Sequence, residues 1–221
     1  MAHFLPSAAL RHLAALRMLL VLTVLTGIAY PLLVTGIAQV AFPDRANGST
    51  LTAHGRTVAS RLIGQNFTLP KRNPHDPDEA PRPDPSWFQP RPSAGGYDPT
   101  RSGASNLGPA NPALTATVRA RRAAVAAFDG VPAASVPADA VTASGSGLDP
   151  AISPASAYEQ VNRVAKARHL TPDQVGQLVS RHVHGRVLGF LGQPYVSVVE
   201  LNHALAAPRR PATAGLRPVR D

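Results

Sequence analysis

Residues 141–150 read VTASGSGLDP and combine glycines with hydroxyl-bearing side chains in a pattern that several chemistries require. Such a loop can offer backbone N–H groups to an anion, carry a nucleophilic serine, or turn the chain. A Walker-type phosphate loop needs a lysine directly after its last glycine, and Leu148 stands there instead. A nucleophile elbow needs G-x-S-x-G, which neither Ser144 nor Ser146 matches. The loop Ser144–Gly147 is therefore either an anion-facing loop or only a turn.

Composition and spacing argue against metal, thiol and nucleic-acid chemistry. The chain has no cysteine, and His182 and His184 would point roughly 200° apart on a helix, so no metal site of its own is predicted. The formal net charge is +9, and Lys71 and Lys166 are the only lysines among 22 basic residues. These charges are scattered and only 5% of residues are aromatic, so we expect no nucleic-acid partner.

The element that must position the rest of the chain is an apolar stretch from Met18 to Pro43, which contains no Asp, Glu, Lys or Arg. A helix crosses a bilayer with roughly 20 apolar residues. A cleaved signal peptide has an apolar core of only about 7–15 residues, followed by small residues, and Gln39 does not fit cleavage after Ala41. We predict a short N-terminal segment, 1–17, and an uncleaved transmembrane helix, 18–42.

Pro31 lies in the middle of this span and has no N–H to donate to the carbonyl of Gly27. In lipid that carbonyl needs another donor. The tetrapeptide TGIA occurs at 26–29 and at 35–38, which places its two copies on opposite faces of an ideal helix. Small residues allow close helix contact in lipid, so Gly27, Pro31 and Gly36 are candidate packing positions. An ordinary single anchor is the alternative.

The charges beside the span do not determine its orientation. Arg11 and Arg17 precede it, and Arg45, Arg56 and Arg61 follow it. A short N-terminus before a long domain weakly favours a cytoplasmic N-terminus. This interpretation gives a single-pass protein of the cell (inner) membrane with its soluble domain on the periplasmic side.

Residues 43–205 are predicted to form one mixed α/β soluble domain, so the fold class is α+β with a single N-terminal transmembrane helix. Three helices are expected where proline follows a capping residue, and two stretches have the composition of strands. The expected helices are 111–128, 153–170 and 171–187, and the expected strands lie within 56–67 and 194–201.

Two proline-rich stretches do not fit regular structure. Residues 70–86 are interpreted as an exposed, partly polyproline-like insertion whose downstream end is held by Trp87, Phe88 and Tyr97. Residues 206–221 are Pro- and Arg-rich and are interpreted as a disordered basic tail.

Several motifs, in the same order, resemble the C subunits of the bacterial Kdp-type potassium-transporting ATPases. The resemblance runs from the span to about Leu205. It is carried by YPLLVTGIAQ (30–39), NGS (47–49), RLIGQNF (61–67), RPSAGGYDP (91–99), SGASNLGPANP (102–112), VPADAVTASGSGLDPAIS (136–153), QVNRVAKARHL (160–170) and GQPYVSVVELNHAL (192–205).

The resemblance implies a non-catalytic accessory subunit of a high-affinity potassium uptake pump. Its partners would be a potassium-channel-like A subunit, an ATP-hydrolysing B subunit, a small F subunit and the lipid bilayer. The resemblance implies that the chain is needed for assembly and stability of the pump complex. It also implies that the chain acts as a catalytic chaperone that raises the ATP affinity of the B subunit. The sequence agrees, since it lacks the D-K-T-G motif of P-type ATPases and one helix cannot form a potassium filter.

ATP would be bound through or together with the B subunit. The family ties the glutamine that opens QVNRVAKARHL to nucleotide, and it matches Gln160 here, followed by Arg163. Alternatively, Gln160 is a polar residue that faces solvent on an amphipathic helix. The loop residues Ser144, Gly145, Ser146 and Gly147 would lie nearby. A domain on the periplasmic side would have to act on ATP use through the membrane subunits.

The chain departs from the family pattern in four places, which are the long 70–86 insertion, Ala104 with Ala110, Asn162, and the basic tail. The competing hypothesis from another class is a membrane-anchored hydrolase that uses Ser144 or Ser146.

Overall fold

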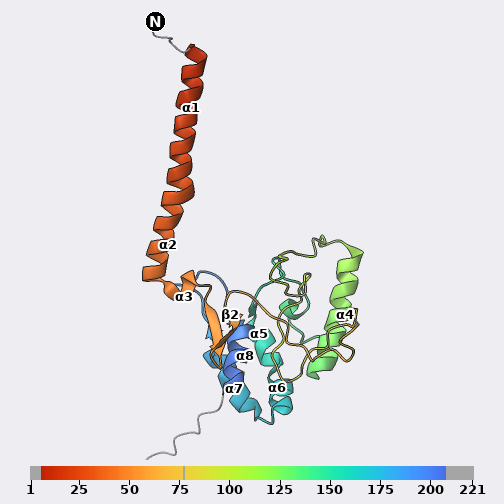
Figure 1. Ribbon diagram of the computed structural model, residues 1–221. Helices are drawn as coiled ribbons and strands as arrows, with labels where there is room; N and C mark the ends of the chain where they lie inside the picture. The colour runs from red at the N-terminus through yellow and green to blue at the C-terminus, as the bar shows by residue number, and fades with distance from the viewer. Residues whose placement is uncertain (1–5, 77, 208–221) are drawn as a thin grey trace, which may run out of the picture. The chain divides into compact units, whose positions relative to one another are not determined.

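The computed structural model describes residues 6–76 and 78–207 of the 221-residue chain. Two compact units follow one another along the sequence, Met1–Thr50 and Leu51–Asp221, and each is described by itself (Figure 1). The predicted segment 1–17 lies partly outside the described residues, and the predicted tail lies almost entirely outside them.

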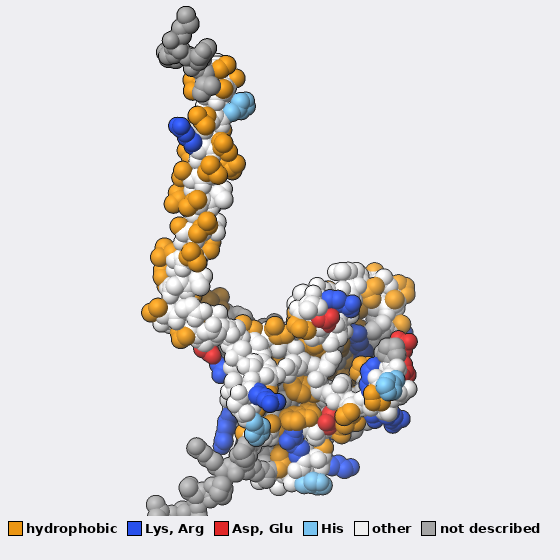
Figure 2. Space-filling view, in the orientation of Figure 1, with side chains coloured by type: hydrophobic (Ala, Val, Ile, Leu, Met, Phe, Trp, Pro, Cys, Tyr) orange, Lys and Arg blue, Asp and Glu red, His pale blue; other side chains and the backbone are white. Residues whose placement is uncertain are grey.

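The first unit is dominated by one long helix. It consists of α1 (Ser7–Val24), a π-helical turn (Leu25–Ala29) and α2 (Tyr30–Ala41), and the short helix α3 (Pro43–Ala46) follows. Its most apolar 18-residue window has a mean hydropathy of 2.1, and it is the one helix in the described part of the chain that is long and apolar enough to cross a membrane. Apolar side chains cover much of its visible face (Figure 2).

This helix begins earlier than the predicted span. Much of the predicted segment 1–17 is helical from Ser7 onward, because SAALRHLAAL consists largely of strong helix formers after Pro6. The helix ends at Ala41, one residue before the expected boundary.

The π-helical turn lies where Pro31 interrupts the hydrogen-bond ladder. Pro31 is near the start of α2, and the N–H of Tyr30 bonds to the carbonyl of Leu25, five residues back. Gly27 lies inside this turn. At Gly36 an added Cβ would meet no atom within 4 Å, so that position leaves room for close approach.

The second unit mixes helices with two small antiparallel sheets, which confirms the α+β class. Strands β1 and β2 pair with each other, and the second sheet has the order β3-β5-β4. The register pairs Ile152 with Val196 and Val183 with Val196. The elements are β1 (Thr50–Ala53), β2 (Arg56–Ser60), α4 (Pro112–Asp129), a 3-10 turn (Ala138–Ala140), β3 (Ala151–Ile152), α5 (Pro154–Glu159), α6 (Val161–Ala167), α7 (Pro172–Arg181), β4 (Val183–His184), β5 (Tyr195–Ser197) and α8 (Val198–Ala206).

The core of this unit lies where α6, α7 and α8 pack against the three-stranded sheet. Figure 1 shows α5 to α8 gathered together, with α4 to one side. The core side chains are aliphatic except for one aromatic ring, that of Phe88, which is fully buried although it follows the proline-rich insertion. They are Phe88, Ile152, Ala157, Val161, Val164, Ala165, Val175, Val179, Val196, Val198 and Leu201.

The predicted helix starts are confirmed by their caps. The side chain of Asn111 accepts from the N–H of Ala113, that of Ser153 from Ser156, and that of Thr171 from Gln174. Each cap is followed by proline at the first helical position, where no N–H is needed.

Two helix ends were predicted wrongly. The helix expected over 153–170 divides at Gln160 into α5 and α6, and the one expected over 171–187 ends at Arg181. Beyond it, Val183 pairs with Val196 in the sheet, and this tertiary pairing overrides the helical pattern.

The strand expected over 194–201 was also wrong beyond its first residues. Strand β5 ends at Ser197, whose hydroxyl accepts from the N–H of Glu200 and caps α8. The S-x-x-E spacing is a helix-start signal that outweighs the β-branched run in this sequence. As a result Val198, Val199 and Leu201 are buried from a helix.

The described residues of the 70–86 insertion are mostly exposed, as predicted, and backbone pairing closes the two ends of the insertion. Thr68 forms an antiparallel bridge with Pro83, and the N–H of Leu69 donates to the carbonyl of Arg82 over 2.8 Å. The carboxylate of Glu79 accepts the backbone N–H groups of Arg72 and Asn73. The downstream end is anchored as expected, since Phe88 and Tyr97 are buried.

Candidate functional site

Gln160 lies at the junction of α5 and α6, and its side-chain amide is almost completely buried, at 5% exposure. Its Oε1 accepts from the backbone N–H of Gln89 and from Nη2 of Arg163, both over 2.6 Å. Its Nε2 donates to the carbonyls of Gln89 and Ser156. The solvent-facing interpretation of Gln160 is therefore wrong, and every polar valence of the amide has a protein partner.

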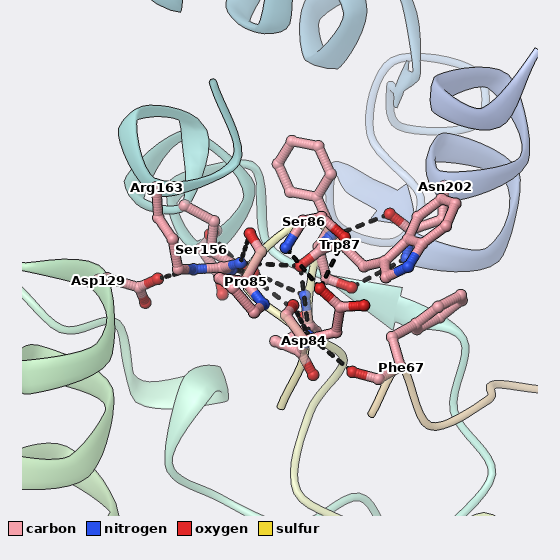
Figure 3. Close-up of polar contacts among 12 residues, drawn as sticks. Phe67, Asp84, Pro85, Ser86, Trp87, Asp129, Ser156, Arg163 and Asn202 are labelled. Carbon is pink, nitrogen blue, oxygen red and sulfur yellow. Dashed lines mark hydrogen bonds and ion pairs between the residues drawn. The ribbon is translucent and has the colours of Figure 1, made fainter. Parts of the chain in front are cut away.

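Arg163, one turn along α6, completes the same network. Its Nε lies 2.5 Å from Oδ1 of Asp129 at the end of α4, and both side chains are buried. Its Nη1 donates to the carbonyls of Pro85 and Trp87 over 2.8 and 2.9 Å. Figure 3 shows Arg163 reaching between Asp129 and the Pro85–Trp87 backbone. The guanidinium uses its donors to join α6, α4 and the end of the insertion.

The electrostatics of Arg163 follow from this burial. Removal from water lowers the pKa of the guanidinium, while the hydrogen bond to Asp129 and its charge act in the opposite direction. The guanidinium carbon also lies 4.4 Å from the ring centroid of Phe128, a cation–π arrangement. An arginine stays protonated under these conditions, so the pair is a fixed charged link between the helices.

Segment 85–89 is bound to the helices at two further points. Asn202 on α8 is almost completely buried, and its amide accepts from the N–H and donates to the carbonyl of Phe88, over 3.0 and 2.9 Å. Arg168 donates to the carbonyl of Ser86 and lies over the ring of Trp87 at 4.0 Å. Of the candidate nucleotide residues, Gln160 and Arg163 thus belong to a clamp that fixes this segment, and the other members of the clamp are Arg168 and Asn202.

A cavity of about 470 Å³ lies beside the clamp. Prolines and the Phe128 ring form much of its wall, and its polar groups include Gln89, Arg121, Glu159 and Gln160. A pocket of this size with apolar walls and a few polar groups is the usual form of a small-molecule site. Of the candidate nucleotide residues, Gln160 reaches this cavity, whereas Arg163 and the 144–147 loop are not part of its lining.

Glu159 lines this cavity, and the pKa of its carboxyl group is shifted by its surroundings. Its Oε2 is buried and has no hydrogen-bond partner. Burial, together with the negative charges of Asp129 and Asp139, raises the pKa of Glu159 to about 7. The carboxyl group of Glu159 is therefore neutralised closer to neutral pH than an ordinary glutamate, which no pattern in the sequence indicates.

The loop Ser144–Gly147 is hydrogen-bonded to two other segments of the chain and does not line the cavity. The N–H of Ser144 donates to the carbonyl of Pro92, and the carbonyl of Gly147 accepts from the hydroxyl of Ser93 over 2.7 Å. The carbonyl of Ser146 accepts from the N–H of Gly103. Gly147 adopts a left-handed conformation with φ of 69°, and Gly145 is exposed. These contacts favour the turn interpretation over the anion-facing one.

Neither serine hydroxyl has the partner that a nucleophile requires. Ser144 is buried and its Oγ has no hydrogen-bond partner, while Oγ of Ser146 accepts from the N–H of Leu148. Within the described residues no histidine or carboxylate bonds to either hydroxyl. The hydrolase alternative therefore receives no support from this geometry.

Comparison with known proteins supplies the family. The family model described as KdpC, the K+-transporting ATPase c chain, matches residues 12–207. The chain belongs to the KdpC family. A potassium-transporting ATPase KdpC subunit of Sorangium cellulosum is 52% identical over 198 residues, covering 88% of this chain and 96% of that protein. KdpC subunits of Kineococcus radiotolerans and Streptomyces coelicolor are 51% and 48% identical, covering 87% and 91% of this chain and 92% and 94% of theirs.

Membership of the KdpC family confirms the resemblance, and the structure adds residues that neither motifs nor spacing revealed. Asp129, which bonds to Arg163, and Asn202, which belongs to the clamp, both lie far from Gln160 and Arg163 along the chain. Asp129 was marked only by its position before the helix-ending Gly130, and Asn202 lies within the motif 192–205, which gave it no role.

Proposed function

We propose that the chain is the accessory C subunit of a high-affinity, ATP-driven potassium uptake pump and that it is needed for assembly and stability of that complex. The observation that carries this proposal is the family match over residues 12–207. The long apolar helix Ser7–Ala41 supports a membrane-anchored component. The clamp of Gln160, Arg163, Arg168 and Asn202 supports a rigid binding body, because its polar groups bond to the chain itself.

In this proposal the partners are the channel-like A subunit, the ATP-hydrolysing B subunit and the small F subunit, within the inner-membrane bilayer. The helix packs against these subunits through Gly27, Pro31 and Gly36, where small side chains and the π-helical turn permit close approach. The soluble domain lies on the periplasmic side. The chain itself performs no catalytic step and binds no metal of its own.

The proposal includes a chaperone role that raises the ATP affinity of the B subunit. Gln160 borders the cavity, but its amide is fully engaged with Gln89, Ser156 and Arg163. Direct nucleotide contact would require replacement of the Gln89 contacts and a cytoplasmic soluble domain, contrary to the periplasmic position proposed above. The alternative within this proposal is that Gln160 and Arg163 act as positioning residues and the effect on ATP travels through linked equilibria.

The test is purification of the full chain in mild detergent from cells that express the whole pump. We expect the A, B and F subunits to be recovered with it, and recovery without a P-type ATPase would overturn the proposal. Removal of residues 1–43 should abolish both recovery and complementation of potassium-limited growth. For the chaperone role, the apparent KM for ATP of the pump should rise when the chain is omitted and fall when it is added back.

A further inference from the structure

One face of α4 forms a wall of the cavity beside Gln160. Arg121, Ala124, Val125, Phe128 and Asp129 all line the cavity. Their positions follow the i, i+3, i+4, i+7, i+8 spacing of a single helix face. At 1.5 Å per residue, Arg121 and Asp129 are about 12 Å apart along the helix axis, so the cavity has two well-separated ends.

Two guanidinium groups meet at the Arg121 end. Nη1 of Arg121 donates to the carbonyl of Val141 over 3.3 Å, and Nη2 of Arg91 donates to the next carbonyl, that of Thr142, over 3.5 Å. Arg91 pairs with Asp149 through Nη1, but its Nε is buried and has no hydrogen-bond partner. Within the described part of the chain Arg121 has no carboxylate partner. This end therefore carries an unbalanced positive charge and a donor that lacks an acceptor.

The Asp129 end is acidic. Glu159 also lines the cavity, and the charges of Asp129 and Asp139 act on its carboxyl group, so it lies near the end of α4. Asp129 is paired with Arg163. The carboxyl group of Glu159 has no such cation and accepts no hydrogen bond from the described residues, and its Oε2 is buried. An ammonium group would supply both the donor and the charge that Glu159 lacks.

Much of the remaining lining is apolar or already hydrogen-bonded. The amides of Gln89 and Gln160 are engaged with backbone carbonyls of the chain itself. The apolar part of the lining includes Pro81, Pro83, Pro90, Pro92, Val125 and Phe128. The space between the two charged ends therefore suits an uncharged, largely apolar body.

A complementary ligand has a carboxylate at one end, an ammonium group at the other and apolar groups between them. The planar guanidinium fork matches a carboxylate. A simple anion would satisfy the arginine end alone, and a simple amine would satisfy Glu159 alone. A single amino acid spans only about 3.5 Å, whereas an extended tripeptide spans about 10 Å, which is close to the separation of the two ends.

We propose that this cavity binds a free peptide of about three residues, with its C-terminal carboxylate at Arg91 and Arg121 and its N-terminal ammonium group at Glu159. Apolar side chains of the peptide pack against Phe128 and the prolines. The residues of the site all belong to the second unit, so this inference goes beyond the proposed function and does not depend on it.

The test is isothermal titration calorimetry of the full chain, purified in mild detergent, with the tripeptide Ala-Leu-Ala. The same peptide is also titrated with an acetylated N-terminus and with an amidated C-terminus. Each cap removes one charge, and we expect each capped peptide to bind at least about tenfold more weakly than the free one. These three titrations use the wild-type chain, so they do not depend on the folding of any variant.

Two variants then assign the ends of the peptide. In Glu159→Gln the free peptide should lose its advantage over the acetylated one, and in Arg121→Gln it should lose most of its advantage over the amidated one. Each variant should keep the preference that belongs to the other end. The matched control is Arg122→Gln, since Arg122 is exposed on the same helix and does not line the cavity. It should bind all three peptides as wild type does.

Four results would overturn this inference. The first is no saturable binding of Ala-Leu-Ala at up to about 10 mM. The second is equal affinity for the free and capped peptides, and the third is tighter binding of the acetylated peptide, which would indicate a site for anions. The fourth is unchanged preferences in both variants, which would place the peptide outside this cavity. None of these results concerns recovery of the ATPase subunits, so the proposed function would stand in each case.

Discussion

Arg163 and Asp129 form an ion pair whose side chains are only 6% and 3% exposed, with 2.5 Å between Nε and Oδ1. This pair is the polar link between α6 and the end of α4. It sits inside a network in which the same guanidinium also bonds to Gln160, Pro85 and Trp87. Removal of one member should therefore cost much more than removal of a surface charge.

Asp129→Ala is expected to lower the free energy of unfolding of the soluble unit by about 3–5 kcal/mol, because it leaves the Arg163 guanidinium buried without its counter-charge. Urea unfolding followed by Trp87 fluorescence would measure this. The matched control is Arg101→Ala, which breaks an ion pair with Asp98 whose side chains are 75% and 42% exposed. That change should cost no more than about 1 kcal/mol. Equal effects of the two variants would contradict the role given to the buried pair.

Gln160→Ala removes the acceptor of two donors, the N–H of Gln89 and Nη2 of Arg163. We expect a loss of at least about 1–3 kcal/mol, the cost of one buried donor left unpaired. The exposed Gln177 on α7 provides the control, and Gln177→Ala should stay within about 0.5 kcal/mol of wild type. If Gln160→Ala melted like wild type, the side chain would not be part of a structural clamp.

The sequence predicted where helices begin better than where they end. Proline after a capping residue marks the start of α4, α5 and α7, and that signal is local. The ends depend on partners elsewhere in the chain. Val183 is in a strand and not in the helix because it pairs with Val196. The residues around Val183 in the sequence do not indicate that pairing.

In the candidate site, too, local sequence signals were predicted and contacts between distant segments were not. Family resemblance drew attention to Gln160 and Arg163, and the structure joins them over 2.6 Å. Their function as a clamp depends on segment 85–89, which is 71 or more residues away along the chain. The mixture of Gly and Ser at 144–147 was compatible with a turn or an anion loop. The folded contacts with Pro92, Ser93 and Gly103 favour the turn, and these partners cannot be read from the loop sequence itself.

Gly147→Ala tests the fastening role of that loop. Gly147 has φ of 69°, and a Cβ there would come 2.7 Å from the carbonyl oxygen of Gly103. Left-handed conformation alone costs a residue with a side chain roughly 1–2 kcal/mol, and the clash adds to it. The control is Gly145→Ala, where a Cβ meets nothing within 4 Å and which should change stability by less than about 0.5 kcal/mol. Similar melting temperatures for the two variants would contradict this account.

Glu159 should make stability depend on pH in an unusual direction. Its pKa is raised from 4.5 to about 7 by burial and by Asp129 and Asp139, so the folded chain binds its proton more tightly than the unfolded chain does. Its stabilising contribution is complete below pH 4.5 and is lost as the pH rises through about 7. In Glu159→Gln the side chain is neutral throughout. That variant should match wild type near pH 4.5 and exceed it at pH 8 in urea midpoint.

Glu79→Gln is the control, because the pKa of Glu79 is shifted in the opposite direction. Backbone hydrogen bonds from Arg72 and Asn73 lower the pKa of Glu79, so its contribution is present above pH 4.5 and fades as the pH falls. This variant should be less stable than wild type at pH 8, and the difference should shrink toward acid pH. If Glu159→Gln were no more stable than wild type at pH 8, the carboxyl group would be hydrated or paired in solution. Glu159, in the cavity beside Gln160, would then be ionised at neutral pH like an ordinary glutamate.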